Sequence, residues 1–417
     1  MKKTYRKKTA LAIMGVILLA VGVLLAIKRW SGSEAEKREP IVEKEKTAKE
    51  IAEGWLGQMD LRAKVGQMII LTNSEQDMTE AFFQELMEIK PGGYILMVPN
   101  ITTFAQTKQM LEKIDKISRL EYGVEGLPMI LATDEEGGNV QRLLYVQDKE
   151  ATDVPYMYDV GKTGDEKLAF EIGKVIGEEV RSLGLNLTFA PDVDVFSNPE
   201  NEVIGKRSFS EDKDVVAKMA LKVASGIESV GVGVAYKHFP GHGDTSIDSH
   251  VALPVISKSW GELERVELYP FRRAIEAGAE MIMVGHIAVN GSEVPASLSE
   301  EVVSEMLKGK MGFSGLAVTD ALNMGAVMEK YTNSEIAVKA VKAGEDLLLM
   351  PADVREARDA ILMAVERGEI TEERIDESVR KILNYKAERL RDFAVGDERN
   401  FGSEAHKKVV QQIIRGE

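Results

Sequence analysis

The hydrophobic positions of this chain gather into short apolar runs that recur from residue 65 onward. Eight runs are recognised, at 65–71, 92–98, 128–136, 185–195, 233–241, 280–289, 315–323 and 346–351. They lack a strict alternation of polar and apolar residues, which is typical of strands buried on both faces of a parallel sheet. The pattern therefore predicts eight parallel strands.

Amphipathic stretches separate these runs. Two clear examples, 166–184 and 299–312, each close with a glycine suited to a helix end. Strands that alternate with helices predict an α/β fold, specifically a (β/α)8 TIM-type barrel in a single catalytic domain. We place this domain at 51–395, with closing helices within 356–390 and a C-terminal tail at 396–417.

The N-terminus begins with a basic segment and an uncharged apolar run, Thr9 to Ile27. These 19 residues are enough to cross a hydrocarbon core of ~30 Å as a helix. We expect a transmembrane anchor within 1–30 and a charged tether at 31–50. A cleaved signal peptide is the alternative, although Ser31-Gly32-Ser33 is a poor cleavage site.

The distribution of basic residues predicts the orientation of this segment. Five basic residues precede the apolar run, whereas only Lys28 and Arg29 follow it directly. This bias places the N-terminus in the cytoplasm and the body outside the membrane. We therefore expect a single-pass membrane protein with an extracytoplasmic catalytic domain, or a secreted protein if the segment is cleaved.

Composition excludes several classes of function. The formal net charge is −15 and no basic stripe is present, which argues against a nucleic-acid partner. The absence of cysteine excludes disulfides, thiolate metal sites and a cysteine nucleophile. We expect no cofactor and a monomeric protein.

Polar side chains stand late in the predicted strands or directly after them. The residues are Asp134, Asp192, Asp194, Lys237, His238, His286 and Asp320. In a (β/α)8 barrel this end of the strands is the catalytic face. A single such residue is more often a helix cap, but seven on one rim predict a functional site.

Residues 237–250, KHFPGHGDTSIDSH, hold three of the five histidines of the chain. His238 and His242 have the spacing of an HExxH metal motif, but that motif requires a helix. Pro240 and Gly241 lie between the two histidines and disfavour a helix. We therefore expect no metal site.

Acid–base chemistry is a second interpretation of the loop. His250 follows Asp248 by two residues, so the carboxylate can contact one ring nitrogen and leave the other for a reacting group. A solvated loop histidine beside a turn aspartate explains the same tripeptide. From these residues alone, both interpretations stay open.

The loop resembles the signature of glycoside hydrolase family 3, in its single-domain β-N-acetylglucosaminidase branch. Further motifs of this family are matched in order by MDLRAKVGQMI (59–69), PGGYILMVPN (91–100), DEEGGNVQRL (134–143), IGKRSFS (204–210) and VTDALNMGAV (318–327). The resemblance extends over roughly residues 55–385. It departs from the common pattern at Glu135, where Gln is usual.

The resemblance implies a role for each matching residue. Asp320 corresponds to the nucleophile, and His250 to the proton donor and later base, with Asp248 as its partner. The residues implied to hold the non-reducing sugar are Asp134, Arg142, Arg207, Lys237 and His238. Arg207 has an alternative as a structural ion pair with a rim aspartate, and the role of His286 stays open.

The implied activity is that of a retaining exo-β-N-acetylglucosaminidase. It would remove terminal β-linked GlcNAc from peptidoglycan fragments or chitooligosaccharides through a covalent glycosyl-aspartate. Only about 27 residues follow the closing helices, so we expect the proton donor to come from a barrel loop. The alternatives are a phosphorylase, a β-glucosidase, or a glycan-binding protein with a decayed site.

Overall fold

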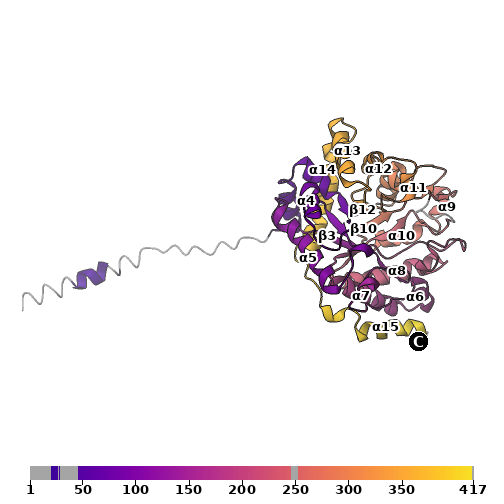
Figure 1. Cartoon of the computed structure of the whole chain (residues 1–417), viewed down its shortest axis with the longest axis horizontal. Coiled ribbons are helices and arrows are strands. Elements are labelled where there is room, and N and C mark those ends of the chain that lie inside the picture. Colours follow the sequence, from indigo (N-terminus) through magenta and orange to yellow (C-terminus); the bar gives the residue numbers. More distant parts are fainter. Residues whose placement is uncertain (1–19, 27, 29–45, 246–251, 416–417) are drawn as a thin grey trace, which may run out of the picture. The chain divides into compact units, whose positions relative to one another are not determined.

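The computed structural model describes residues 20–26, 28, 46–245 and 252–415 (Figure 1). The chain divides into two compact units, Met1–Lys46 and Thr47–Glu417, and the elements below belong to the second. Helix α2 (Ala48–Leu56) begins inside the segment predicted as a tether. The segment predicted as a tail contains α15 (Glu404–Arg415). The domain boundaries at residues 50 and 395 stay predictions.

Parallel strands form the interior of the second unit. A six-stranded sheet has the order β13 (Leu348–Leu349), β1 (Ile69–Leu71), β2 (Gly93–Ile95), β3 (Ile130–Thr133), β6 (Leu187–Thr188) and β7 (Gly233–Val234). A three-stranded sheet has the order β12 (Leu316–Thr319), β10 (Met281–Val284) and β8 (Tyr236–Phe239). Each of the eight apolar runs thus contributes at least one strand.

The prediction of a closed (β/α)8 TIM-type barrel is wrong for the described part of the chain. The six-stranded sheet is an open half-barrel, and only the isolated bridges Asp192↔Lys237 and Val318↔Leu347 lie between it and the three-stranded sheet. At one seam, Pro191 has no N–H group to donate to a ladder. At the other, the N–H of Leu349 donates to the Thr319 hydroxyl (3.0 Å) instead of a backbone carbonyl.

The predicted N-terminal transmembrane helix is not supported. Crossing a membrane takes about 20 consecutive apolar residues. Within the described ranges, no helix combines the necessary length and apolar character. Of the expected span, residues 20–26 are described and helical, and residues 9–19 and 27 lie outside the described residues.

Helices surround the strands (Figure 1). The longer ones are α3 (Leu61–Gln67), α4 (Glu80–Ile89), α5 (Phe104–Glu121), α7 (Glu166–Ser182), α8 (Lys213–Glu228), α10 (Leu268–Glu276), α12 (Asn333–Ala343), α13 (Val354–Glu366) and α14 (Glu372–Tyr385). Shorter elements are α6 (Met157–Thr163), α9 (Trp260–Leu263), α11 (Gly325–Met328), a π-helix at Glu301–Lys310, the antiparallel pair β4 (Glu135–Gly137) and β5 (Val140–Gln141), and the parallel pair β9 (Val255–Ile256) and β11 (Ala288–Val289).

Helices α7 and α8 pack closely because glycines face the contact. A Cβ atom on Gly173 would lie 2.0 Å from the carbonyl oxygen of Val223, and one on Gly226 would lie 2.1 Å from that of Phe170. The start of α7 is fixed by Asp165, whose carboxylate accepts the N–H groups of Lys167 and Leu168. Helix α7 therefore begins at a defined residue. The glycines let it pack closely against α8.

The C-terminal helix α15 contacts α6 and α7 (Figure 1). Its His406 lies between two carboxylates of α7, with Nε2 2.7 Å from Glu178 and Nδ1 2.9 Å from Glu179. Burial alone would lower the pKa of His406, but the two carboxylates raise it above the usual value. The imidazolium form therefore holds α15 against the rest of the unit.

Lys386 is a buried lysine that lies outside the strand ends that carry the predicted site. Its side chain is inaccessible to solvent, and its Nζ donates to Oε1 of Gln67 at 2.7 Å. Burial lowers the pKa of Lys386 to about 7. The neutral amine is therefore favoured above about pH 7 in the folded protein, since removing an ammonium from water is costly.

We expect Lys386 to make stability depend on pH. Its folded pKa lies below the unfolded value, so its contribution is present above pH 10.5 and is lost as the pH falls towards 7. The gain in unfolding free energy of Lys386→Met over the wild type should be larger at pH 7 than at pH 9.5, by on the order of a few kcal/mol. Urea unfolding at both values measures this, with the exposed Lys408→Met as control. A Lys386→Met difference that is independent of pH would contradict the assignment.

Candidate functional site

The predicted site residues that the structure describes lie at or just after the carboxyl ends of the strands. Asp134 follows β3, Arg142 follows β5, Lys237 and His238 belong to β8, Asp320 follows β12, and Arg207 ends a short 3-10 helix (Gly205–Arg207). His250 and Asp248 lie outside the described residues. Six of the eight predicted residues can therefore be placed.

Asp134 is the centre of the predicted sugar-binding group. Its Oδ1 lies 3.1 Å from Nζ of Lys237, and its Oδ2 lies 3.3 Å from Nη2 of Arg142. The Lys237 side chain is 4% exposed, whereas Asp134 and Arg142 are 17% and 23% exposed. The Asp134 carboxylate is thus paired with a buried ammonium and with a partly exposed guanidinium, and it is itself partly exposed to solvent.

Glu136 was not predicted, yet it connects two of the predicted residues. Its carboxylate lies 2.6 Å from Nζ of Lys237 and accepts Nε and Nη2 of Arg207 at 2.8 and 2.9 Å. Burial alone would raise the pKa of Glu136, but the attraction of Arg207 and Lys237 holds it well below its usual range. The one sequence signal that pointed to Glu136 is its place in the quoted DEEGG motif.

Arg207 forms the structural ion pairs that its alternative interpretation required. Besides Glu136, its Nη2 lies 3.5 Å from Oδ2 of Asp192, and its Nη1 donates to the carbonyl of Val203 at 3.2 Å. Burial alone would lower its pKa, but Glu136 and Asp192 raise it. The guanidinium therefore stays charged and is fixed in position.

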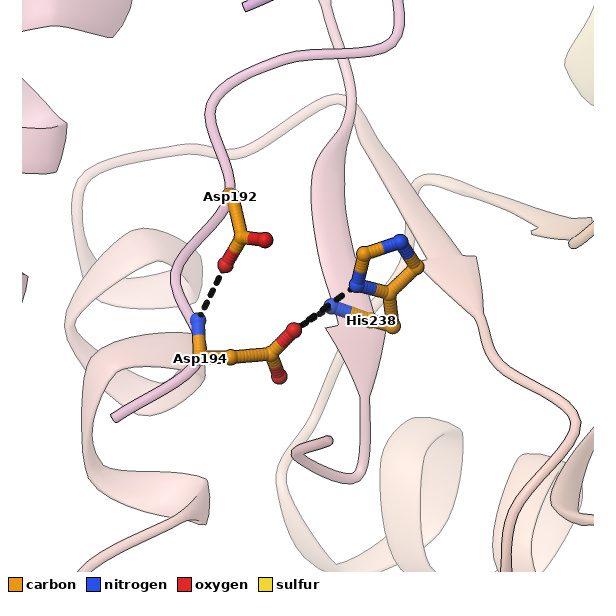
Figure 2. Close-up of side chains that lie close together, drawn as sticks. All are labelled: Asp192, Asp194 and His238. Carbon is orange, nitrogen blue, oxygen red and sulfur yellow. Dashed lines mark hydrogen bonds and ion pairs between the residues drawn. The ribbon is translucent and has the colours of Figure 1, made fainter. Parts of the chain in front are cut away.

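His238 is oriented by two aspartates from the segment after β6 (Figure 2). Its Nδ1 lies 2.7 Å from Oδ2 of Asp194, and Oδ1 of Asp192 accepts the N–H of Asp194 at 2.9 Å. Burial and the neighbouring Arg207 lower the pKa of His238 to about 4. The ring is therefore neutral, and Nδ1–H donates to Asp194. The other ring nitrogen, Nε2, is then an acceptor 3.4 Å from Arg207.

The same three side chains carry ligand atoms that lie close enough together to hold a metal ion. One ligand atom each from Asp192, Asp194 and His238 falls within 4.8 Å of the others, and all three residues are buried. However, Asp194 also accepts the backbone N–H of His242 at 2.6 Å, and a guanidinium borders Asp192. Burial and Asp194 raise the pKa of Asp192 to about 7. The contacts fit a hydrogen-bond network that supports His238.

Asp320 lies at the end of β12 and is partly exposed. Burial would raise its pKa, but the N–H of Ala321 and the Lys237 ammonium hold it below the usual value. The N–H of Ala321 donates to Oδ1 of Asp320 at 2.7 Å. Asp320 therefore carries a negative charge at neutral pH.

His286 supports the backbone beside Asp320, which addresses its open role. Its Nε2 donates to the carbonyl of Ala321 at 2.9 Å, and its Nδ1 lies 2.7 Å from the Ser297 hydroxyl. Because a carbonyl only accepts, Nε2 carries the hydrogen and Nδ1 accepts from Ser297. The ring thus fixes the residue that follows Asp320.

Glu135 closes the hairpin that carries Arg142. Its Oε2 accepts the N–H groups of Arg142 and Leu143 at 2.7 and 3.1 Å. Burial raises the pKa of Glu135 to about 8. The carboxyl is therefore mainly protonated at neutral pH and resembles, in charge, the Gln that is usual at this position of the motif.

Together these contacts form a preorganised polar site. Buried donors surround Asp134 and can bind ring hydroxyl groups without reorganisation. An ionised carboxylate, Asp320, follows a neighbouring strand and can attack an electrophilic carbon. Such a combination suits substitution at a polar, hydroxyl-rich substrate.

Comparison with known proteins gives a family match. The sequence profile described as "Glycosyl hydrolase family 3 N terminal domain" matches residues 60–385. "Beta-hexosaminidase A" of Pseudoalteromonas piscicida is 33% identical over 71% of this chain, and the match covers 53% of that relative. "Beta-hexosaminidase" of Nitrosospira multiformis is 33% identical over 62% of this chain, and the match covers 73% of that relative. This chain thus spans about half the length of the first relative.

A solved structure gives the same result. The glycoside hydrolase family 3 β-N-acetylglucosaminidase from Paenibacillus sp. strain FPU-7 superposes with a TM-score of 0.80 at 35% sequence identity. The superposition covers 86% of this chain and 69% of that structure. Both sequence and fold therefore point to the family that the motifs resemble.

We expect Glu135→Gln to change how stability depends on pH. The folded pKa of Glu135, about 8, lies above the unfolded value of 4.5. Its contribution is therefore present below pH 4.5 and is lost as the pH rises through 8. As the pH rises from 5 to 9, the unfolding free energy of the variant should increase relative to that of the wild type, by roughly a few kcal/mol.

Urea unfolding at pH 5, 7 and 9 measures this change. Glu121→Gln is a matched control, because Glu121 is exposed. If Glu135→Gln and Glu121→Gln follow the wild type in parallel across this range, Glu135 is ionised in the folded protein and the assignment fails.

Proposed function

Because this chain belongs to glycoside hydrolase family 3, we propose that it is a retaining exo-β-N-acetylglucosaminidase. The carrying observation is that Nζ of Lys237 lies 3.1 Å from Asp134 and 2.6 Å from Glu136, at strand ends shared with Asp320. The two relatives and the solved neighbour described above are named for activity on N-acetylhexosaminides.

Recognition of the non-reducing sugar is assigned to the group around Asp134. The carboxylate accepts hydrogen bonds from sugar hydroxyls, and the cations Lys237 and Arg142 donate to sugar oxygens. Arg207 and Glu136 hold Lys237 and His238 in place through the contacts described above. These groups are already ordered before a sugar binds, so binding costs little side-chain entropy.

The first chemical step is a displacement at the anomeric carbon. The Asp320 carboxylate donates an electron pair to this carbon, and the bond to the leaving oxygen breaks as His250 transfers a proton to that oxygen. The product is a covalent ester between the sugar and Asp320. The low pKa of Asp320 favours the ionised nucleophile that this step requires.

The second step returns the enzyme to its starting state. His250, now the base, removes a proton from water, and the water oxygen attacks the anomeric carbon while the ester bond to Asp320 breaks. Two inversions give net retention of configuration. The partner Asp248 would fix the tautomer of His250, since a carboxylate at one ring nitrogen leaves the other for proton transfer.

The substrate class follows from the family branch. We assign terminal β-linked GlcNAc of peptidoglycan fragments or chitooligosaccharides. The alternatives keep the same residues: a phosphorylase would use phosphate in place of water in the second step, and a β-glucosidase would accept a sugar without the 2-acetamido group. Rates with and without phosphate, and paired nitrophenyl glycosides of GlcNAc and glucose, separate these activities.

We expect Asp320→Asn to abolish turnover while leaving the sugar site formed. Loss of a nucleophile costs roughly 10⁴-fold or more in kcat. Release of GlcNAc from nitrophenyl β-GlcNAc, followed by NMR, measures both the rate and the anomeric form first produced. The exposed Asp77→Asn should leave the rate unchanged. Undiminished turnover in Asp320→Asn, or first release of the α-anomer, would contradict a retaining mechanism at Asp320.

We expect His250→Ala to lower turnover most for substrates with poor leaving groups. A positioned proton donor contributes about 10²–10⁴-fold, and an activated leaving group needs less of this assistance. Chitobiose turnover should therefore fall much more than that of a dinitrophenyl glycoside. Equal losses on both substrates would show that His250 is not the proton donor.

A further inference from the structure

The C-terminal segment that the sequence predicts as a tail packs against the loop at 148–155, which leads from the β4–β5 hairpin to α6 and is called the connecting loop. Lys149 of this loop forms an ion pair with Glu398. The two segments also meet at a glycine, because a Cβ atom on Gly402 would lie 1.8 Å from the carbonyl oxygen of Glu150. The C-terminal segment and the connecting loop are therefore fixed against each other.

Glu179 on α7 binds both of these segments at once. Its side chain is 4% exposed, and its carboxylate accepts the N–H groups of Thr152 and Gly402, each at 3.0 Å. Nδ1 of His406 on α15 lies 2.9 Å from the same carboxylate. One buried carboxylate thus accepts hydrogen bonds from the connecting loop, from the turn before α15 and from α15 itself.

The connecting loop in turn holds the hairpin of β4 and β5. Nε2 of Gln141 donates to Oδ1 of Asp153 at 3.0 Å, and Oε1 of Gln141 accepts the N–H of Val154 at 2.8 Å. The N–H of Gly138 donates to the carbonyl of Val154 at 2.8 Å. Arg142 directly follows Gln141 along the chain. The position of this sugar-binding guanidinium therefore depends on the connecting loop.

Glu179 also acts on the hairpin through its charge. Burial is the main cause that raises the pKa of Glu135 to about 8, and the Glu179 carboxylate adds to this rise. Oε2 of Glu135 accepts the N–H of Arg142 at 2.7 Å. A displaced Glu179 would therefore alter both the connecting loop and the carboxyl group that holds the backbone of Arg142.

His406 fixes the position of Glu179 from the side of α15. The residue is 4% exposed, and each ring nitrogen has its own carboxylate: Nδ1 contacts Glu179, and Nε2 contacts Glu178 at 2.7 Å. In the imidazolium form both nitrogens donate. Only the Nδ1 contact reaches the carboxylate that holds the connecting loop, so the two contacts can be tested separately.

We propose that Glu179 and His406 are positioning residues for sugar binding, which hold the connecting loop and the β4–β5 hairpin so that Arg142 meets the non-reducing sugar. The assignment rests on the proposed function, because it takes Arg142 as a sugar-binding residue. Both residues act through Arg142 and not by touching the sugar. Helix α15 then contributes to substrate affinity, although it lies in the segment predicted as a tail.

A matched pair of variants at His406 tests the route. An asparagine amide reaches about as far as Nδ1 of histidine, and a glutamine amide about as far as Nε2, so His406→Asn keeps the donor to Glu179 and His406→Gln keeps the donor to Glu178. On nitrophenyl GlcNAc, His406→Gln should raise KM by about 3- to 10-fold and change kcat less than twofold. His406→Asn should keep KM within twofold of the wild type.

Two further comparisons separate positioning from a loss of stability. Ile336→Val, in the core beside α12, lowers stability away from this cluster and should leave KM unchanged. Arg142→Gln should raise KM by itself, and adding His406→Gln should then raise it less than twofold further. Rises in KM that multiply would overturn the proposal. Equal KM values for His406→Asn and His406→Gln would likewise exclude Glu179 as the route.

Hydrogen exchange separates this inference from the proposed function. The N–H groups of Thr152, Val154 and Gly138 donate in the contacts described above. They should exchange faster in His406→Gln than in the wild type, and at the wild-type rate in His406→Asn. If the wild type cleaves no N-acetylglucosaminide, the proposed function fails, and this exchange pattern alone decides whether Glu179 and His406 hold the hairpin. Unchanged exchange of all three N–H groups in His406→Gln would reject the positioning role.

Discussion

The site depends on one buried carboxylate, Glu136, which compensates two buried cations at once. It lies 2.6 Å from Lys237 and accepts two hydrogen bonds from Arg207, and its side chain is 2% exposed. Two cations this close repel each other in a medium of low dielectric constant, and a carboxylate paired with both of them offsets that repulsion. The charge on Lys237 and the position of Arg207 both follow from Glu136. Through them, the orientation of Asp134 and the neutrality of His238 follow as well.

The departures from a regular barrel occur where this network is inserted. The segment after β6 carries Pro191, Asp192 and Asp194, and the backbone there makes an isolated bridge to Lys237 instead of a ladder. Two aspartates that must accept hydrogen bonds from His238 and from backbone N–H groups cannot also be placed as ordinary strand residues. The sheet is therefore interrupted at the place where Asp192 and Asp194 turn their carboxylates toward hydrogen-bond donors.

The sequence predicted the positions of the strands well, for physical reasons, and the roles of the site residues stay predictions. Buried parallel strands require apolar runs, so all eight were found, and carboxylates and cations at strand ends have no structural purpose in a core. Glu136 was missed because spacing alone cannot tell which partners each of the three adjacent acids in DEEGG will meet. Glu135 and Glu136 in fact have opposite states, since one faces backbone N–H groups and the other faces two cations.

The expectations that failed concern long-range closure rather than local pattern. A run of apolar residues predicts a strand, but whether two neighbouring strands complete a ladder depends on single residues such as Pro191 and Thr319. Composition likewise favoured a membrane span at Thr9–Ile27, which the described helices do not support. Patterning specifies which segments are buried, and individual donors and acceptors then decide how those segments join.

The electrostatics of the site also bear on the choice of proton donor. His238 is held neutral by burial and by Arg207, so it cannot supply a proton near neutral pH. Glu136 is paired with Arg207 and Lys237, which favours its ionised form and removes it as an acid, and Asp134 is held by Lys237 and Arg142 at the sugar-binding position. Among the described residues at this rim, each candidate acid is thereby committed to binding or support. A donor carried on a separate loop, as proposed for His250, is then the arrangement that leaves the sugar-binding charges undisturbed during proton transfer.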